Sequence, residues 1–281
     1  MKTILVTTDF SAPSQTAGNF ALSLANALKA DLTLCHAIKM LAASSDQTLP
    51  NEYKMLRDSA IEQLEFQALD LRLDEQESCN PGPRIDYYTA LGSVTDMVND
   101  LAHDRKAILV VMGMFGAGMV NRIFLGSNSQ DIINNAKCPV LLIPFKKFPE
   151  LVNKIAFASD LNKGDIELIN SIASFARPFN AEILIIHISK TKADQEKVDR
   201  FLNEVTNKVN YAKIYYKHIE DTDIGRGLNW IAKNGFIDIF AMVHRKKIFP
   251  GNLFNSSETQ KLSRNIEIPL LVFQENQYPV F

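Results

Sequence analysis

The chain has 281 residues, of which 46% are hydrophobic and 22% are charged, a composition that excludes disordered and fibrous proteins. Its formal net charge of −2 argues against a protein built mainly to hold the phosphates of a nucleic acid. The uncharged stretch 107–120 contains three glycines and is shorter than the roughly 18 residues of a membrane span. The first residues, MKTILVTTDF, have no signal-peptide apolar region, and Cys35, Cys79 and Cys138 show no metal-ligand spacing. We therefore expect a cytoplasmic protein with reduced thiols and no membrane partner.

The sequence contains two related copies of one unit. The segment KTILVTTDFS, which includes Asp9, is matched by NKIAFASDLN around Asp160, 151 positions later. Near the end of each copy, CPVLLI at 138–143 matches IPLLVF at 268–273, where the offset has fallen to 130. The second copy is therefore about 21 residues shorter, and the length of the chain also favours two domains. The predicted domains are residues 1–147 and 150–281.

In chain order, the first copy alternates five apolar runs with helical segments. The runs rich in Val, Ile, Leu and Thr predict strands, and the last two are apolar almost throughout, as in a parallel sheet covered on both faces. Apolar residues between 17 and 28 recur at helical spacing, with Ser11 or Ser14 as the N-cap. The predicted strands are 2–8, 31–37, 84–89, 107–112 and Val140–Pro144, and the later helices are 52–77, 92–105 and Ser127–Asn135.

The second copy repeats this order, with strands near 154–158, 182–188, 212–219, 237–243 and 269–273. The alternation of strands and helices indicates parallel strands joined by right-handed crossovers. The predicted fold class is therefore α/β, with two tandem doubly wound five-stranded parallel-sheet domains. In such sheets, ligands bind beyond the carboxyl ends of the strands. These ends are 7–11, 37–40 and 113–118 in the first copy, and 158–162, 188–190 and 243–247 in the second.

A glycine-rich loop follows the fourth predicted strand of the first copy. Gly113 and Gly116 lie three apart, and Gly126-Ser127-Asn128 follows at the expected start of a helix. Glycine lets the backbone turn sharply and approach a ligand closely, and the free N–H groups of a helix N-terminus attract phosphate. The same glycines would also serve a plain strand-to-helix loop, so they do not by themselves decide between the two interpretations.

The full spacing G-x-x-G-x9-G-[ST], between a strand and a helix followed by C-P-V, resembles the universal stress protein family. The TTDFS segment at 7–11 and Cys35-His36-Ala37 look like the ends of that family's first two strands. The resemblance covers both copies, so the chain looks like a tandem member with a universal stress protein-like, adenine nucleotide alpha hydrolase-like fold. It implies a cytoplasmic stress-response protein, and many relatives with this glycine pattern bind ATP or related adenine nucleotides.

The resemblance also implies a role for each matching residue of the first copy. Asp9 and the Thr7 backbone would lie by the adenosine. The Ala37 backbone would meet the adenine edge, and Gly113 would face the ribose. The phosphates would be held by Gly116, Gly126, Ser127 and Asn128. Two positions depart from the family, in which Thr7 is often proline and Asn128 is often a small or β-branched residue, but each needs only its backbone.

Asp9 requires a physical role, because a bare carboxylate 4 Å from a phosphate is repelled by about 1–4 kcal/mol. It would therefore accept hydrogen bonds from ribose or adenine, or reach the phosphates through Mg2+. The alternative is an aspartate that caps the following loop. Arg122 is a candidate phosphate partner, although a solvated helical arginine is the favoured interpretation. The expected cofactors are ATP, ADP or AMP, together with Mg2+.

The second copy has lost the glycine loop. Its three glycine positions align with Val243, Lys246 and Ser256, and side chains now project where phosphate would lie. The basic run 244–247 (HRKK) is interpreted as a solvated loop rather than as an anion site. We therefore predict one nucleotide site per chain, in residues 1–147.

The predicted function is a nucleotide-sensing or regulatory binding module of the stress response, read by an unidentified protein partner. No residue is evidently placed to activate water, so no catalytic residue is assigned and at most slow ATP hydrolysis is expected. The alternatives are an ATPase or another enzyme that uses adenine nucleotides, and a scaffold with a vestigial pocket.

Two further expectations concern the histidines and the sheet edges. The histidines, including His36 and His187 at equivalent strand ends, are interpreted as structural residues rather than metal ligands. In the resembled family, domains pair through their last strands. Val140–Pro144 and 270–273 are therefore expected to pair within this chain as a pseudo-dimer, and further homodimerisation is left open.

Overall fold

The computed structural model describes residues 2–39, 49–75, 82–114, 127–146, 151–221, 223–245, 267–275 and 277–281. Within these ranges, the N-terminal half alternates five strands with four helices, as the apolar periodicity predicts. They are β1 (Thr3–Thr7), α1 (Ala12–Leu28), β2 (Asp31–Ile38), α2 (Leu49–Glu75), β3 (Ile85–Leu91), α3 (Val94–Asp104), β4 (Ala107–Met114), α4 (Ser127–Asn135) and β5 (Val140–Pro144). Ser11 is the N-cap of α1, and its hydroxyl accepts a hydrogen bond from the Ser14 N–H.

The C-terminal half repeats the same order. Its elements are β6 (Lys154–Ala158), α5 (Gly164–Ala176), the 3-10 turn η1 (Arg177–Phe179), β7 (Glu182–Ser189), α6 (Gln195–Lys208), β8 (Ile214–Glu220), α7 (Ile224–Asn234), β9 (Ile239–His244) and β10 (Leu270–Gln274). Helices α5, α6 and α7 are the counterparts of α1, α2 and α3. The position that corresponds to α4 lies outside the described residues.

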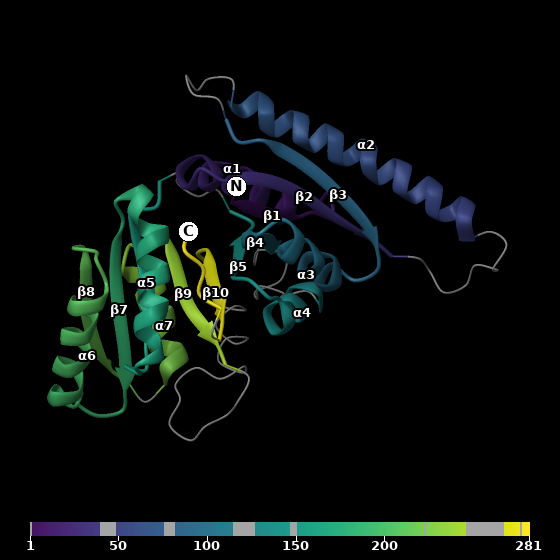
Figure 1. The fold of residues 1–281 in the computed structure, drawn as a ribbon. Helices are drawn as coiled ribbons and strands as arrows, with labels where there is room; N and C mark the ends of the chain where they lie inside the picture. Colours follow the sequence, from purple (N-terminus) through teal and green to yellow (C-terminus); the bar gives the residue numbers. More distant parts are fainter. Residues whose placement is uncertain are drawn as a thin grey trace.

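All ten strands form one sheet, in the order β3-β2-β1-β4-β5-β10-β9-β6-β7-β8 (Figure 1). Each half contributes five parallel strands in the same relative order, so the predicted α/β class with two doubly wound units is confirmed. The order reverses beside β1, which pairs with β2 on one side and with β4 on the other. The carboxyl ends of β1 and β4 therefore meet at the point where such sheets bind ligands.

The halves join where β5 and β10 pair antiparallel, with Leu142 opposite Leu270 and Val140 opposite Val272. This pairing of the last strands was expected, and it covers two edges that would otherwise be exposed. Beyond the strands, the Gln274 side chain donates a buried hydrogen bond of 2.9 Å to the Ile133 carbonyl of α4. The junction therefore links β10 of the C-terminal half to the helix at the predicted phosphate end of the N-terminal half.

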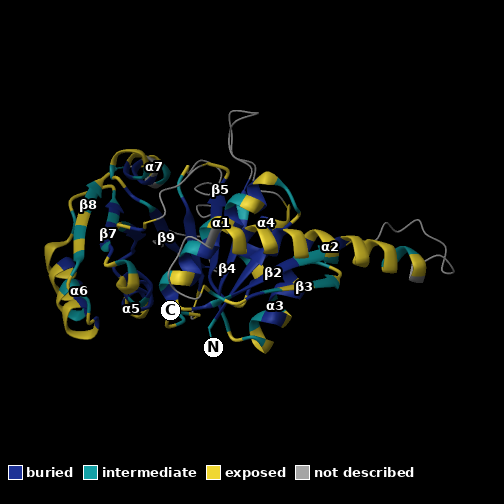
Figure 2. Cartoon of the chain, turned by 90° about the horizontal axis from the view of Figure 1, so that it is seen from above, coloured by how far each residue is buried: buried dark blue, intermediate teal, exposed yellow. Residues whose placement is uncertain are grey.

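The sheet is covered on both faces. One buried cluster joins α1, α2, α5 and α6 to the sheet, and the other joins α3, α4 and α7 to the opposite face. Both clusters continue across the junction, so the two halves share their cores. Figure 2 shows the buried strands between helices whose outward faces are exposed. This burial on both faces explains the nearly continuous apolar sequence of β4 and β5.

Candidate functional site

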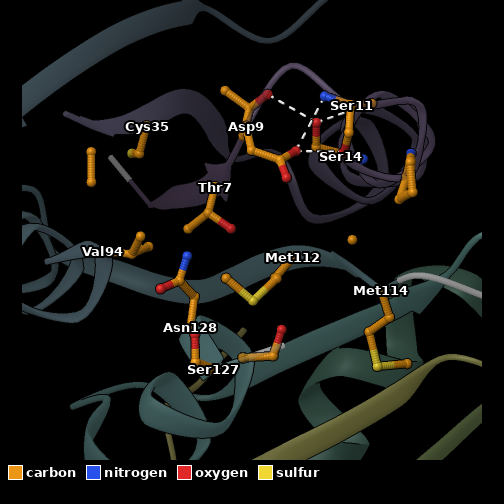
Figure 3. Close-up of a pocket in the computed structure, with 15 residues that line it drawn as sticks. Thr7, Asp9, Ser11, Ser14, Cys35, Val94, Met112, Met114, Ser127 and Asn128 are labelled. Atoms are coloured by element: carbon orange, nitrogen blue, oxygen red, sulfur yellow. Dashed lines mark hydrogen bonds between the residues drawn. The ribbon is translucent and has the colours of Figure 1, made fainter. Parts of the chain in front are cut away.

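A cavity of about 180 Å³ lies at the carboxyl ends of β1, β2 and β4 and is closed on one side by the start of α4 (Figure 3). The structure brings together six of the eight residues that were predicted to bind nucleotide. They are Thr7, Asp9, Ala37, Gly113, Ser127 and Asn128. Gly116, Gly126 and the candidate phosphate partner Arg122 lie outside the described residues.

Thr7 ends β1 and turns its side chain into this cavity, toward Asn128 (Figure 3). The residue is only 5% exposed, and its hydroxyl has no hydrogen-bond partner among the residues that the structure describes. An unpaired buried hydroxyl is costly, about 1–3 kcal/mol, so such groups usually meet a ligand, a water or another protein group. Sequence reasoning gave Thr7 only a backbone role and missed this hydroxyl.

Asp9 lies on the exposed rim of the cavity, where it caps the start of the following turn. One carboxylate oxygen accepts hydrogen bonds from the Ser11 N–H and the Ser11 hydroxyl, and the other points toward the cavity (Figure 3). Burial raises the pKa of this carboxyl, but the hydrogen bonds from Ser11 and Ser14 outweigh that effect and hold the pKa below its usual range. Asp9 is therefore an anion at neutral pH, and the loop-capping role is present in the structure.

The turn after β1 is fixed by a short hydrogen-bond network. The Thr8 and Ser14 hydroxyls lie 3.1 Å apart, and the Phe10 N–H donates to the Thr8 hydroxyl. Phe10 has φ 64°, a conformation that L residues rarely adopt, and these bonds hold it there. The His36 ring nitrogen Nδ1 lies 2.9 Å from the Thr8 carbonyl, as expected of a structural histidine. The network sets the direction in which Thr7 and Asp9 leave the strand.

Gly113 is required where α1 packs on the end of β4. A Cβ atom added at this position would lie 2.4 Å from the Pro13 carbonyl oxygen and 2.9 Å from the Ser14 nitrogen. Only a residue without a side chain allows the first turn of α1 to approach so closely. Gly113 therefore has a role in packing α1 against β4, whereas the sequence analysis predicted only a contact with ribose.

The start of α4 forms the polar end of the cavity. Ser127 and Asn128 occupy its first turn, where backbone N–H groups have no partner within the helix and the helix dipole is positive. The Lys39 ammonium, which follows β2, donates a hydrogen bond of 3.2 Å to the Asn128 side-chain oxygen. Below them, the Thr95 hydroxyl of α3 donates to Asp131, which ties α4 to α3. Lys39 had no predicted role.

Part of the cavity wall is apolar. Cys35, Ala37, Val94 and Met112 contribute to its wall. Burial raises the pKa of the Cys35 thiol to about 12, so the group stays neutral, and its sulfur donates to the Thr33 carbonyl. The cavity thus combines an apolar pocket with a helix N-terminus, an arrangement suited to a ligand that has a flat apolar part and an anionic part.

The equivalent cleft of the C-terminal half is filled by an arginine. Arg245 places its guanidinium between two buried carboxylates, 2.5 Å from Asp160 and 2.7 Å from Asp165. Asp160 is the counterpart of Asp9, and Asp165 is the counterpart of Ser14. The interpretation of 244–247 as a solvated loop is therefore wrong for Arg245, which is 8% exposed, and for the buried His244. The partners that bury Arg245 are 80 and 85 positions away in sequence, so local charge composition did not reveal them.

The apolar end of that cleft is also closed. Ile188 stands where the first half has Ala37, and it packs so closely on α7 that a Cβ at Gly227 would lie 2.9 Å from its Cδ1 atom. Val243, the counterpart of Gly113, is buried as well. The two halves thus share a scaffold but differ in what occupies the ends of their strands.

The histidines of the described chain are held by protein contacts. Within the described ranges, no three His, Cys, Asp or Glu side chains gather in a way that would hold a metal ion. The rings of His187 and His218 stack 5.8 Å apart across β7 and β8, and each has a protein partner. His187 Nδ1 lies 2.9 Å from the Ser159 carbonyl, and His218 Nε2 lies 2.7 Å from the Ser189 hydroxyl. These contacts fit the structural interpretation of the histidines.

Comparison with known proteins agrees with this architecture. The universal stress protein family profile matches residues 1–144. A universal stress protein of Thermus aquaticus is 32% identical over 149 residues, which cover 50% of this chain and 98% of the relative. A universal stress protein of Methanocaldococcus jannaschii is 30% identical over 142 residues, covering 50% of this chain and 81% of the relative.

The similarity to solved structures extends to both halves. The crystal structure of a universal stress protein from Archaeoglobus fulgidus covers 98% of this chain and 98% of its own, with a TM-score of 0.73 at 17% identity. A second structure, of a universal stress protein from Pseudomonas aeruginosa, covers 97% and 92% with a TM-score of 0.61 at 13% identity. None of the helices in the described ranges is long and apolar enough to cross a membrane. The chain belongs to the universal stress protein family, as a tandem member with two domains of the same fold.

Proposed function

We propose that the chain binds one adenine nucleotide, ATP in the first instance, in its N-terminal domain (residues 1–147) and acts as a regulatory binding module. The observation that carries this proposal is the buried hydroxyl of Thr7, which has no partner in the described chain and belongs to a residue of the cavity wall, together with the start of α4 on the same wall. A cytoplasmic location and a role in the stress response, which follow from the family, form part of the proposal. Another protein would bind the nucleotide-bound form of the chain and respond to it.

The lining of the cavity suits each part of such a ligand. Ala37 and Val94 offer an apolar wall to the adenine ring, and the Ala37 backbone lies at its edge. The Thr7 hydroxyl and the free oxygen of Asp9 are hydrogen-bonding groups of the kind that a ribose requires. The N–H groups of Ser127 and Asn128 would hold the phosphates. Mg2+ would enter with the phosphates and neutralise part of their charge, and Asp9 would contact that ion in place of the ribose only if the phosphates turned toward it.

The proposal favours binding over catalysis. Asp9 is the acidic group on the described cavity wall, and the lowered pKa of its carboxyl makes it a weak general base. We therefore expect at most slow hydrolysis of ATP. An enzyme that uses adenine nucleotides, or a scaffold with a vestigial pocket, would be distinguished by rapid turnover or by the lack of binding.

A single site per chain is part of the same proposal. In the C-terminal domain (residues 150–281), Arg245 occupies the polar end of the equivalent cleft and Ile188 the apolar end. A nucleotide would have to displace both side chains and leave two buried carboxylates without their cation. That cost makes binding there unfavourable.

The decisive experiment is calorimetric titration of the purified chain with ATP and Mg2+, together with a turnover assay. We expect about one ATP per chain and negligible turnover. Thr7→Val removes the hydroxyl and is expected to weaken ATP binding about tenfold, whereas Thr7→Ser keeps the hydroxyl and serves as the matched control. Ala37→Ile, which copies Ile188, is expected to abolish binding. Two equivalent ATP sites, or wild-type affinity in Ala37→Ile, would contradict the proposal.

A further inference from the structure

We propose that Lys39 contacts the phosphates of the bound nucleotide and sets the preference of the site for charged over uncharged adenosine ligands. This inference rests on the proposed function. It adds to the site a residue that belongs neither to the glycine pattern nor to the strand-end motifs. Its basis is the hydrogen bond between the ammonium group and Asn128, a residue that lines the cavity.

Lys39 directly follows β2 and contacts Asn128, a residue of the cavity wall in the first turn of α4. Its ammonium nitrogen lies 3.2 Å from the side-chain oxygen of Asn128. The lysine is exposed, and within the described part of the chain it forms no ion pair. Among the residues that the structure describes, this full positive charge is therefore matched by a neutral amide oxygen.

The electrostatics of this contact are unfavourable without an anion. The N-terminus of α4 carries a partial positive charge and N–H groups that have no partner within the helix, and the Lys39 ammonium is held beside it. Asp9, on the far rim, is already bonded to Ser11. A phosphate between Lys39 and the helix start would satisfy both positive groups, with charge-assisted hydrogen bonds stronger than the bond to the amide.

A second, independent feature indicates that a ligand occupies this space. The Thr7 hydroxyl is buried in the same cavity without a partner in the described chain, and its side chain points toward Asn128 (Figure 3). A ligand that satisfied Thr7 with its sugar would extend its phosphates toward Asn128. The Lys39 ammonium, bonded to Asn128, then lies beside those phosphates.

The duplicated fold supplies a matched control. Lys190 follows β7 as Lys39 follows β2, at the usual offset of 151 positions. The cleft beside Lys190 is filled by Arg245 with its two aspartates. Replacing Lys190 removes the same charge from the same strand end of the other domain, where no nucleotide is proposed to bind.

The test is calorimetric titration with ATP, AMP and adenosine on wild-type protein and on Lys39→Gln, Lys39→Arg and Lys190→Gln. We expect Lys39→Gln to weaken ATP binding about five- to tenfold, the effect of one partly exposed charge-assisted contact, with adenosine affinity unchanged. Lys39→Arg and Lys190→Gln should keep the wild-type preference. Added salt should also reduce the preference of the wild type for ATP over adenosine, and it should reduce the preference of Lys39→Gln less.

The outcomes separate this inference from the proposed function. If wild-type protein binds ATP and Lys39→Gln keeps the full preference over adenosine, the role of Lys39 is wrong and the nucleotide site stands. An equal loss of ATP affinity in Lys190→Gln would also overturn the role of Lys39, because the effect would then come from net charge alone. If the wild type binds none of the three ligands, both proposals fail together.

Discussion

Replacing Arg245 by methionine removes the cation from a buried triad and leaves two carboxylates facing each other. Asp160 and Asp165 are 5% and 1% exposed, and the guanidinium lies within 2.7 Å of both. Methionine has a similar length and no charge, so the substitution changes the electrostatics more than the volume. We expect it to destabilise the C-terminal domain strongly.

The magnitude follows from the geometry. Two opposite charges about 4 Å apart attract each other by about 4 kcal/mol at an effective dielectric constant of 20. Desolvation of all three groups offsets much of that gain in the native protein, but removal of the arginine leaves the desolvation cost of the carboxylates uncompensated. Measured losses of one partner from a buried pair are about 3–5 kcal/mol, and we expect Arg245→Met to fall in that range.

The assay uses urea unfolding followed by fluorescence of Trp230, the only tryptophan of the chain, which lies on α7 of the C-terminal domain. Arg226→Met is the control, because Arg226 forms a surface ion pair with Asp221 and its removal should have little effect. The triple variant with Asp160→Asn and Asp165→Asn should regain much of the stability that Arg245→Met loses. If Arg245→Met costs no more than Arg226→Met, the triad is not a stabilising element and the reasoning is refuted.

Three other substitutions test individual contacts. Thr7→Val should raise the free energy of unfolding of the ligand-free protein, by up to about 1–3 kcal/mol, since it removes a buried hydroxyl that has no partner in the described chain, and a loss of stability in urea would reveal a missed bond. Gly113→Ala should cost about 1–3 kcal/mol because its Cβ would clash with the Pro13 carbonyl, whereas Gly164→Ala, which meets open space, should cost little; equal losses would contradict this. Burial lowers the pKa of His187, so its contribution to stability is present above about pH 6.5 and is lost as the pH falls through the lower folded-state pKa. His187→Asn should flatten that part of a plot of unfolding free energy against pH, and an unchanged slope would refute the assignment.

The fold was predictable because its signals are repeated and local. Strands buried on both faces carry continuous apolar runs, and the duplicated sequence shows the same order of elements twice. The antiparallel junction of β5 and β10 was expected from the family rather than from the residues, since apolar edges alone do not specify a partner. Helix boundaries shifted by a few residues, as at α2, which begins at Leu49 instead of 52.

The site was predictable only in part, because side-chain direction depends on contacts between distant segments. Strand-end and helix-start positions placed six of the predicted residues around one cavity. The free Thr7 hydroxyl and the reach of Lys39 to Asn128 depend on register and on the packing of α4, which sequence spacing does not encode. Arg245 was misread for the same reason: its neighbours in the chain are basic and polar, but its partners in space are two aspartates.

The two clefts show how one scaffold can favour ligands of opposite charge. In the first, Asp9 is the one carboxylate on the described wall and is capped at the rim, and the wall includes a positive helix terminus, so an anion is favoured. In the second, the position of Ser14 is taken by Asp165, so that two carboxylates face the same space and require a cation. Arg245 supplies that cation from within the chain. The exchange of one hydroxyl for one carboxylate, together with the arginine that follows β9, is therefore our explanation for the proposed lack of a nucleotide site in the C-terminal domain, without any change in the sheet.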